Sequence, residues 1–417
     1  MEIKQNMRTG VCELMIIFFL VSGFLLGGCR LEKQSECINI DVAAALKQTG
    51  KFPLSEMVSE AEVIMLDTVR DAFFGNMNSL SMTDHFFGFV CDQQKRAYLF
   101  NRSGKFISNI GRRGKGPGEF AEPNVLAISP DEKYILIGDP WQGKLILFDM
   151  AGHFIREKVI KQDSPGWRFE VVIFADVSSI YVAFRRPSTA SAGYASILKY
   201  DLDFNLSSKI LPRPGTDEEA GESIYITLTP SGDNTCYWEA GKDTVYYIDR
   251  KGTARPRYHL DIKNHCSDME KGQRKLYVPG QTEVCTKAIS VVDLPGYLLA
   301  YFFDRGGSRT LIIDKKTNAA FAPDRPIACD TTSGESWIRT SIDNDIYGLE
   351  PLFFDQYIPE RNELIAQVRP GWAIETHDMA CVRQRQVKFP KVRDQLVTLS
   401  ESRLGSENTA LVVMKLR

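Results

Sequence analysis

Residues 137–149 read IGDPWQGKLILFD, an apolar strand ending in an acid, a short polar turn, and a second apolar strand ending in Asp. The same pattern recurs at residues 89–101, 237–249 and 301–314, and a looser copy occupies residues 183–201. In the four regular copies, nine or ten residues separate the acid that ends the first strand from the closing Asp or Asn. Short strands repeated at intervals of roughly fifty residues are typical of a β-propeller.

We therefore expect an all-β chain folded as a six-bladed β-propeller of four-stranded antiparallel blades. The sixth blade is the least regular, so five or seven blades remain as alternatives. The expected blades fall at residues 79–110, 125–160, 169–211, 224–262 and 286–321, with a sixth that begins near residues 337–341 and ends at residues 411–416.

The two ends of the propeller are expected to meet. The apolar segment at residues 63–66 has no local partner, so we expect it to pair with the final strand at residues 411–416 and close the ring, which removes exposed sheet edges. An irregular, partly helical insertion is expected at about residues 342–407, with an amphipathic helix at residues 392–404. The propeller domain as a whole is expected to span residues 51–417.

The N-terminal segment reads as an export signal over residues 1–28, followed by a polar tether over residues 29–50. Its apolar run, residues 14–26, is shorter than the roughly 20 residues that span a bilayer. The run ends in Leu26-Gly27-Gly28-Cys29, which resembles the lipobox of bacterial lipoproteins. That resemblance implies a lipid on Cys29 and a place in the cell envelope, most simply the outer membrane, with the side left open. An ordinary cleaved signal with a chance Cys is the alternative.

Charge and cysteine content narrow the classes of partner. The formal net charge is −2, which argues against nucleic acid as a partner because nucleic-acid binding usually needs a basic field. Of the nine cysteines, seven remain without Cys12 and Cys29, and they contain no CxxC pair. Zinc-ligand spacing is therefore absent, and a single disulfide such as Cys266–Cys285 remains open.

The stretch GRRGKGPGEF at residues 111–120, with Pro123, Asp139 and residues 145–149, resembles the NHL-type repeat of six-bladed propellers. Together with FPLSE at residues 52–56 and ENTALVV at residues 407–413, it makes the mature chain similar to the six-bladed β-propeller lipoproteins of Gram-negative anaerobes. Most members of that family lack an assigned activity, so the resemblance implies a fold and a location rather than a reaction.

The glycine-rich part of that stretch is not a P-loop. Gly116 is followed by Pro117, and the next expected element is a strand rather than a helix. We expect it to be a link between blades whose glycines allow tight turning.

Propeller topology groups the candidate ligand-binding residues. The link between blades and the loop between the second and third strands of a blade open on the same face. We therefore expect a ligand-binding set of cations and one Trp around the channel mouth: Arg112, Arg113, Lys115, Trp141, Arg185, Arg186, Lys242, Arg305 and Arg309. Such a set suits an anionic or sugar-like ligand. The alternative is a solvated surface, with these charges paired to Asp139 or Asp304.

Catalytic chemistry has little support in the sequence. The repeated strand-ending acids are expected to accept hydrogen bonds from turn amides, with a ring of calcium ligands as an alternative. The five histidines show no metal-ligand spacing, and GxSxG is absent, so we expect no catalytic residue, metal or cofactor. The expected function is a monomeric, membrane-anchored module that binds a glycan, peptide or protein partner. The alternative is a metal-dependent extracytoplasmic hydrolase or lyase at the channel mouth.

Overall fold

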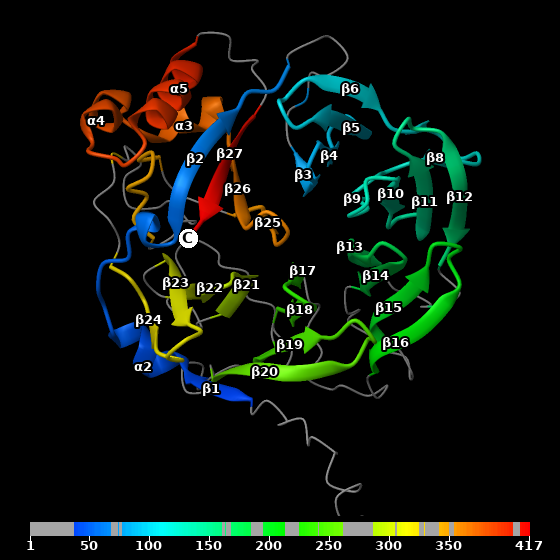
Figure 1. Ribbon diagram of the computed structural model, residues 1–417, viewed down its shortest axis with the longest axis horizontal. Helices are drawn as coiled ribbons and strands as arrows, with labels where there is room; N and C mark the ends of the chain where they lie inside the picture. The colour runs from blue at the N-terminus through cyan, green and yellow to red at the C-terminus, as the bar shows by residue number, and fades with distance from the viewer. Residues whose placement is uncertain are drawn as a thin grey trace, which may run out of the picture. The chain divides into compact units, whose positions relative to one another are not determined.

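Six small antiparallel sheets, each built on four strands, are arranged as a six-bladed β-propeller in the computed structural model (Figure 1). The predicted fold class and blade number are confirmed. The structure describes residues 37–67, 74, 77–160, 163, 168–184, 195–212, 225–240, 242–261, 287–304, 307–324, 329, 342–349, 354–402 and 409–417. The propeller unit begins at Ile38 and ends at Arg417.

In each of the first five blades, four consecutive strands follow one another from the inside of the ring to the outside. Blade 1 contains β3 (Asn78–Met82), β4 (Phe86–Cys91), β5 (Arg96–Asn101) and β6 (Phe106–Asn109). Blade 2 contains β9 (Val125–Ile128), β10 (Tyr134–Asp139), β11 (Lys144–Asp149) and β12 (Phe154–Val159). Blade 3 contains β13 (Phe169–Asp176), β14 (Ser179–Phe184), β15 (Ala195–Asp201) and β16 (Leu206–Pro212). These bounds match the predicted blades closely.

The next two blades follow the same order. Blade 4 contains β17 (Ile226–Ser231), β18 (Asn234–Glu239), β19 (Thr244–Ile248) and β20 (Ala254–Asp261). Blade 5 contains β21 (Lys287–Asp293), β22 (Tyr297–Asp304), β23 (Gly307–Asp314) and β24 (Ala320–Phe321). A short parallel pair, β7 (Arg112–Arg113) and β8 (Glu119–Phe120), lies in the link between blades 1 and 2.

Blade 6 joins the two ends of the chain. It contains β25 (Gln356–Ile358), β26 (Glu363–Val368), β27 (Ala410–Leu416) and, outermost, β2 (Val58–Ile64). Val63 pairs with Val412 and Ile64 with Leu411 in antiparallel register, so the predicted closure by the N- and C-terminal strands is confirmed. The segment at residues 337–341, predicted to begin this blade, lies outside the described residues.

The folded unit begins earlier than the predicted boundary at residue 51. Within the segment predicted to be a tether, residues 38–47 form β1 (Ile38–Asp41) and α2 (Val42–Lys47). Strand β1 pairs in parallel with β20 and adds a fifth strand to blade 4. Ile40, Val42 and Leu46 are buried against blades 4 and 5, and burial of this apolar face stabilises the segment where polarity alone indicated a tether.

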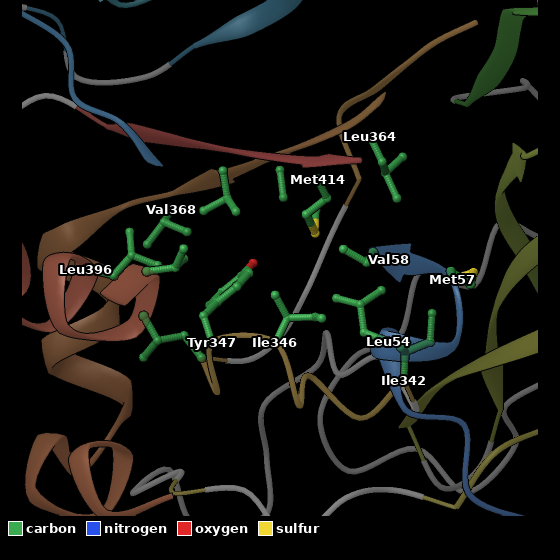
Figure 2. Close-up of a cluster of buried hydrophobic side chains, with 14 of the residues drawn as sticks. Leu54, Met57, Val58, Ile342, Ile346, Tyr347, Leu364, Val368, Leu396 and Met414 are labelled. Atoms are coloured by element: carbon green, nitrogen blue, oxygen red, sulfur yellow. The ribbon is translucent and has the colours of Figure 1, made fainter. Parts of the chain in front are cut away.

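The irregular insertion is helical where the structure describes it after β26. Three helices, α3 (Pro370–Thr376), α4 (Met379–Gln384) and α5 (Pro390–Glu401), lie beside blade 6 (Figure 1). Helix α5 corresponds to the helix predicted at residues 392–404. Figure 2 shows how Leu396 of α5, Tyr347 and Met414 of β27 share one apolar cluster. Leu54 of the 3₁₀ turn η1 (Leu54–Glu56) joins the same cluster.

The closing Asp or Asn of each repeat holds the turn between the third and fourth strands. The Oδ1 atom of Asp149 accepts hydrogen bonds from the backbone N of Ala151 and of His153, at 2.9 and 2.8 Å. The corresponding acceptors are Asn101, Asp201, Asp249 and Asp314. The residues that close the repeats are therefore structural. Their side-chain oxygens accept hydrogen bonds from backbone N–H groups of the turn.

Candidate functional site

The link between blades 1 and 2 is closed by its own acid. The Glu119 carboxylate accepts hydrogen bonds from the backbone N of Gly116 at 2.9 Å and from Nε of Arg112 at 2.7 Å. The hydrogen bond from the backbone of Gly116, followed by that from Arg112, lowers the pKa of Glu119. A Cβ on Gly114 would meet Oε2 of Glu119 at 2.0 Å, so the carboxylate fills the loop. This supports the prediction of a structural link rather than a phosphate cradle.

Blade 2 anchors that link through two buried charged residues. The fully buried Asp139 accepts hydrogen bonds from the backbone N of Ala121 at 2.8 Å and of Trp141 at 3.1 Å. Nζ of Lys144, only 3% exposed, lies 2.9 Å from the carbonyl oxygen of Glu119 and 2.8 Å from Oε2 of Glu157. The link and the turn carrying Trp141 are therefore held side by side.

The predicted cations of this region are exposed on that surface. Arg112 has 81% of its side chain exposed and pairs with Glu119, while Arg113 and Lys115 are exposed and show no ion pair within the described part of the chain. Trp141 is 55% exposed, and the guanidinium carbon of Arg168 lies 3.4 Å from its ring centroid. Arg168 was not in the predicted set.

The other predicted residues lie in blades 4 and 5 or outside the described residues. Arg309 lies within β23, opposite Phe302, rather than in a turn, and Lys242 accepts a hydrogen bond from Trp238 through its backbone oxygen. Arg185, Arg186, Arg305 and Cys29 lie outside the described residues, as do Cys266 and Cys285. The structure instead contains a disulfide that the sequence analysis missed, Cys329–Cys381.

A central channel of about 1080 Å³ runs between the innermost strands β3, β9, β13, β17, β21 and β25. None of Arg112, Arg113, Lys115, Trp141 and Arg309 lines it. We call the side onto which the inter-blade links open the link face. The innermost strands begin at the link face, so the mouth there is lined by Asn78, Asn124, Glu170, Asp355, Arg369 and Trp372.

Several polar side chains along the channel wall form hydrogen bonds between one blade and the next. Oγ of Ser81 accepts a hydrogen bond from the backbone N of Ile128 at 3.0 Å, which joins blade 1 to blade 2. Oγ1 of Thr227 donates to the carbonyl oxygen of Val291 at 3.0 Å, which joins blade 4 to blade 5. Oε1 of Gln356 accepts from the backbone N of Met82 at 2.8 Å. Because these side chains are engaged in hydrogen bonds between blades, the residues at the mouth are the better candidates for contact with a ligand.

Asp355 is an acid of the mouth with a raised pKa. Its Oδ2 accepts a hydrogen bond from the backbone N of Gln367 at 2.7 Å, and its Oδ1 accepts from Nε2 of Gln367 at 2.8 Å. Asp355 is exposed to the channel, and desolvation by the surrounding blades raises its pKa to about 7. The Gln367 hydrogen bonds and the positive charge of Arg369 oppose the rise. The net effect of these groups is a pKa above the ordinary value of 3.8.

Arg369 and Trp372 complete the mouth. Arg369 is the N-cap residue of α3, and its exposed guanidinium makes no side-chain hydrogen bond or ion pair with the residues that the structure describes. Trp372 lies in the first turn of α3 and is 39% exposed. An exposed guanidinium and an exposed indole at the entrance of a channel are typical of ligand recognition.

Asp355, Arg369 and Trp372 escaped prediction because they lie where the repeat pattern of the sequence is weakest. The available signal was local: Gln356–Ile358 and Glu363–Val368 form a hairpin, followed by Pro370 at the first position of a helix. Among the described residues, no group of three or more His, Cys, Asp and Glu side chains is placed to bind a metal ion. Likewise, no helix in these segments is long and apolar enough to cross a membrane.

Comparison with known proteins supports the fold. The chain is similar to BF0058 of Bacteroides fragilis, which carries the description of an exported protein; the TM-score is 0.62 at 14% identity, covering 92% of this chain and 100% of that chain. It is also similar to a member of the DUF4221 family from Bacteroides vulgatus, with a TM-score of 0.47 at 11% identity over 86% of this chain and 97% of that one. At 14% identity the likeness to BF0058 shows the fold alone.

No curated protein matches the chain. A family model, described as a domain of unknown function, DUF4934, matches residues 37–415, which is nearly the whole propeller. The chain therefore belongs to the DUF4934 family.

Proposed function

We propose that this chain is a lipid-anchored, extracytoplasmic binding propeller that takes a glycan at the link-face mouth of its channel. The observation that carries the proposal is the pair of Arg369 and Trp372 at the entrance of the channel. A sugar ring stacks its apolar face on an indole, and a free guanidinium binds hydroxyl or carboxylate oxygens through two parallel N–H groups.

The polar groups beside this pair suit the hydroxyls of a sugar. Asn78 and Asn124 each offer both a donor and an acceptor, and Asp355 and Glu170 offer carboxylate oxygens. Gln367 fixes the orientation of Asp355, which reduces the ordering required when a ligand binds. The mouth therefore combines an aromatic surface with several directional polar groups.

A longer ligand would extend from the mouth across the link face. Arg112, Arg113, Lys115 and Trp141 lie on this face and supply exposed cations and an indole for acidic groups of the same ligand. In this proposal Arg185, Arg186, Arg305 and Arg309 remain secondary candidates. A peptide or an envelope protein that uses the same mouth is the alternative partner.

Export and anchoring rest on the N-terminal sequence. The lipobox-like ending at Cys29 supports lipidation, and the description of BF0058 as exported supports an extracytoplasmic location. The Cys329–Cys381 disulfide agrees with an oxidising compartment. The resemblance of residues 111–149 to an NHL-type repeat stays part of the same proposal.

Lipidation is tested by expressing the full chain and a Cys29→Ser variant in a Gram-negative host with an alkyne-labelled fatty acid. We expect label and membrane association for the natural chain only, since acyl chains anchor by burying methylenes at about 0.8 kcal/mol each. Equal membrane association of the two chains would contradict the anchor. Light scattering of the purified protein tests the expected monomer.

Glycan binding is tested with the detergent-solubilised full chain on a printed array of bacterial and host polysaccharides. We expect discrete signals that Trp372→Ala removes and that the matched control Val177→Ala, another exposed apolar side chain, keeps. An array without any signal, followed by cross-linking of an envelope protein at Trp372, would replace the glycan with a protein partner.

A second candidate function is hydrolysis or elimination at the same mouth. Asp355, with its pKa raised to about 7, holds a proton that it can donate at neutral pH. Reducing-end assays on any bound polysaccharide test this alternative: cleavage that Asp355→Asn abolishes while binding persists would establish an enzyme. Binding without cleavage would leave a binding module.

A further inference from the structure

The disulfide Cys329–Cys381 lies next to the helix that carries Trp372. The two Cα atoms are 5.5 Å apart, and 52 positions separate the cysteines in the sequence. Cys329 is buried within the apolar cluster that supports blade 6, whereas Cys381, in α4, is exposed. The bridge therefore joins an exposed residue of α4 to a residue of the apolar cluster.

The turn between α3 and α4 is also attached to Cys329. The backbone N of Asp378 donates a hydrogen bond to the carbonyl oxygen of Cys329 at 2.8 Å. The side chain of Asp378 caps α4 by accepting from the backbone N of Ala380 at 2.9 Å and of Cys381 at 3.3 Å. Bridge, backbone bond and cap together fix the position of this turn.

Trp372 rests on that turn. The His377 ring, in a residue only 4% exposed, lies edge-on to the indole of Trp372, with ring centroids 5.9 Å apart and planes at 70°. Oγ1 of Thr376 donates to the carbonyl oxygen of Trp372 at 2.8 Å and lies 2.9 Å from Nδ1 of His377. Helix α3 has only seven residues, so its own hydrogen bonds contribute little stability and its orientation depends on such contacts.

We infer that the Cys329–Cys381 disulfide positions Trp372 at the channel mouth, so that the affinity of the mouth depends on the oxidation state of this bridge. The dependence of affinity rests on the proposed glycan-binding function, whereas the positioning of Trp372 does not. Cys329, His377 and Asp378 act here as positioning residues. Breaking the bridge loosens the turn. Part of the binding free energy of the ligand is then used to order the indole of Trp372, which lowers the affinity.

The redox step is a reduction by a dithiol or a phosphine. A dithiol delivers two electrons and two protons to the bridge, yielding the thiols of Cys329 and Cys381 while the dithiol becomes a disulfide. With a phosphine, water supplies the oxygen of the phosphine oxide and the two thiol protons. Cys381 is the exposed residue of the pair, so we expect either reagent to approach the bridge from its side.

Fluorine NMR tests the positioning without any ligand. The detergent-solubilised full chain is labelled with 5-fluorotryptophan at its five Trp residues, and Trp372→Phe assigns the signal of Trp372. We expect the double variant Cys329→Ser, Cys381→Ser to shift or broaden that signal and leave the signal of the buried Trp238 unchanged. The control Cys37→Ser replaces an exposed cysteine outside this bridge and is expected to change neither signal.

An unchanged Trp372 signal in the double variant would overturn the inference. Should the double variant fail to fold, shown by a displaced Trp238 signal, phosphine reduction of the natural chain followed by mass mapping of the two thiols provides the same comparison. Calorimetry with an array-identified polysaccharide is expected to show binding about three- to tenfold weaker after the bridge is broken. An indole that moves while no polysaccharide binds at all would refute the proposed function and keep the positioning.

Discussion

Gln367 holds both carboxylate oxygens of Asp355, with its backbone N 2.7 Å from Oδ2 and its Nε2 2.8 Å from Oδ1. Asp355 immediately precedes β25, the innermost strand of blade 6, and Gln367 lies near the end of β26, the next strand. The pair therefore places an oriented acid at the link-face mouth, beside the Arg369 charge that acts on its pKa. This arrangement leads to a prediction about pH.

Asp355 should make the folded state less stable as the pH rises. Its pKa in the folded protein, about 7, exceeds the ordinary value of 3.8, so the folded state binds more protons between these values. The free energy of unfolding then falls as the pH rises from 4 to 7. We expect Asp355→Asn to raise the melting temperature relative to the natural chain more at pH 8 than at pH 5. Calorimetric scans at the two pH values measure this, and a constant difference would contradict the raised pKa.

Gly104 should be intolerant of any side chain. Its φ is +87°, and a Cβ there would meet the carbonyl oxygen of Met65 at 2.0 Å. Gly252, in the same turn of blade 4, has a φ of +89° but finds its nearest neighbour, in Ile210, at 3.4 Å. We expect Gly252→Ala to cost about 1 kcal/mol of unfolding free energy and Gly104→Ala about 2–4 kcal/mol. Urea unfolding followed by fluorescence compares them, and equal costs would refute the steric argument.

The acid that ends the second strand of blade 2 and the acid that ends its third strand should differ in their tolerance to substitution. Asp139 is fully buried and accepts hydrogen bonds from both the link and the turn, so Asp139→Ala is expected to cost about 3–5 kcal/mol. Asp149→Asn should change stability by less than about 0.5 kcal/mol, because Asn101 performs the same role in blade 1. Denaturant midpoints measure both. A large loss for Asp149→Asn would show a role for its charge.

Lys144 should protect the link between blades 1 and 2 from proteolysis. Its Nζ lies 3.1 Å from the carbonyl oxygen of Gly116 and 2.9 Å from that of Glu119. We expect Lys144→Met to loosen the link, so that trypsin cleaves after Arg113 and Lys115 several-fold faster. Mass spectrometry of timed digests measures this rate. Lys199→Met, which removes a comparable contact to the carbonyl oxygen of Arg250, is the control and should leave cleavage in the link unchanged.

The propeller fold could be predicted because each repeat contains a local pattern that indicates its strands and turns. Each blade pairs apolar strands with an Asx turn, as at Asp149, and the need to bury edges required the N- and C-terminal strands to meet, as Val63 and Val412 do. β1 escaped prediction because only its pairing with β20, distant in sequence, distinguishes it from a polar tether.

The candidate site was less predictable. Topology correctly gives the face onto which the links open, but the distance of a side chain from the channel depends on its place along the link. Arg113 and Lys115 therefore lie away from the channel wall, while Arg369 and Trp372 reach it from an insertion that has no repeat pattern. The bridge Cys329–Cys381 was equally hidden, since cysteine spacing does not determine connectivity.

The most direct test of the account is polysaccharide binding by the natural chain, Trp372→Ala and Trp141→Ala, measured on one array and quantified by titration calorimetry. If the mouth of the channel is the primary site, Trp372→Ala abolishes binding, and Trp141→Ala, which alters only the outer part of the link face, weakens it by less than about tenfold. Loss of binding in Trp141→Ala with full affinity retained in Trp372→Ala would contradict the account and assign the site to the exposed cations of the link.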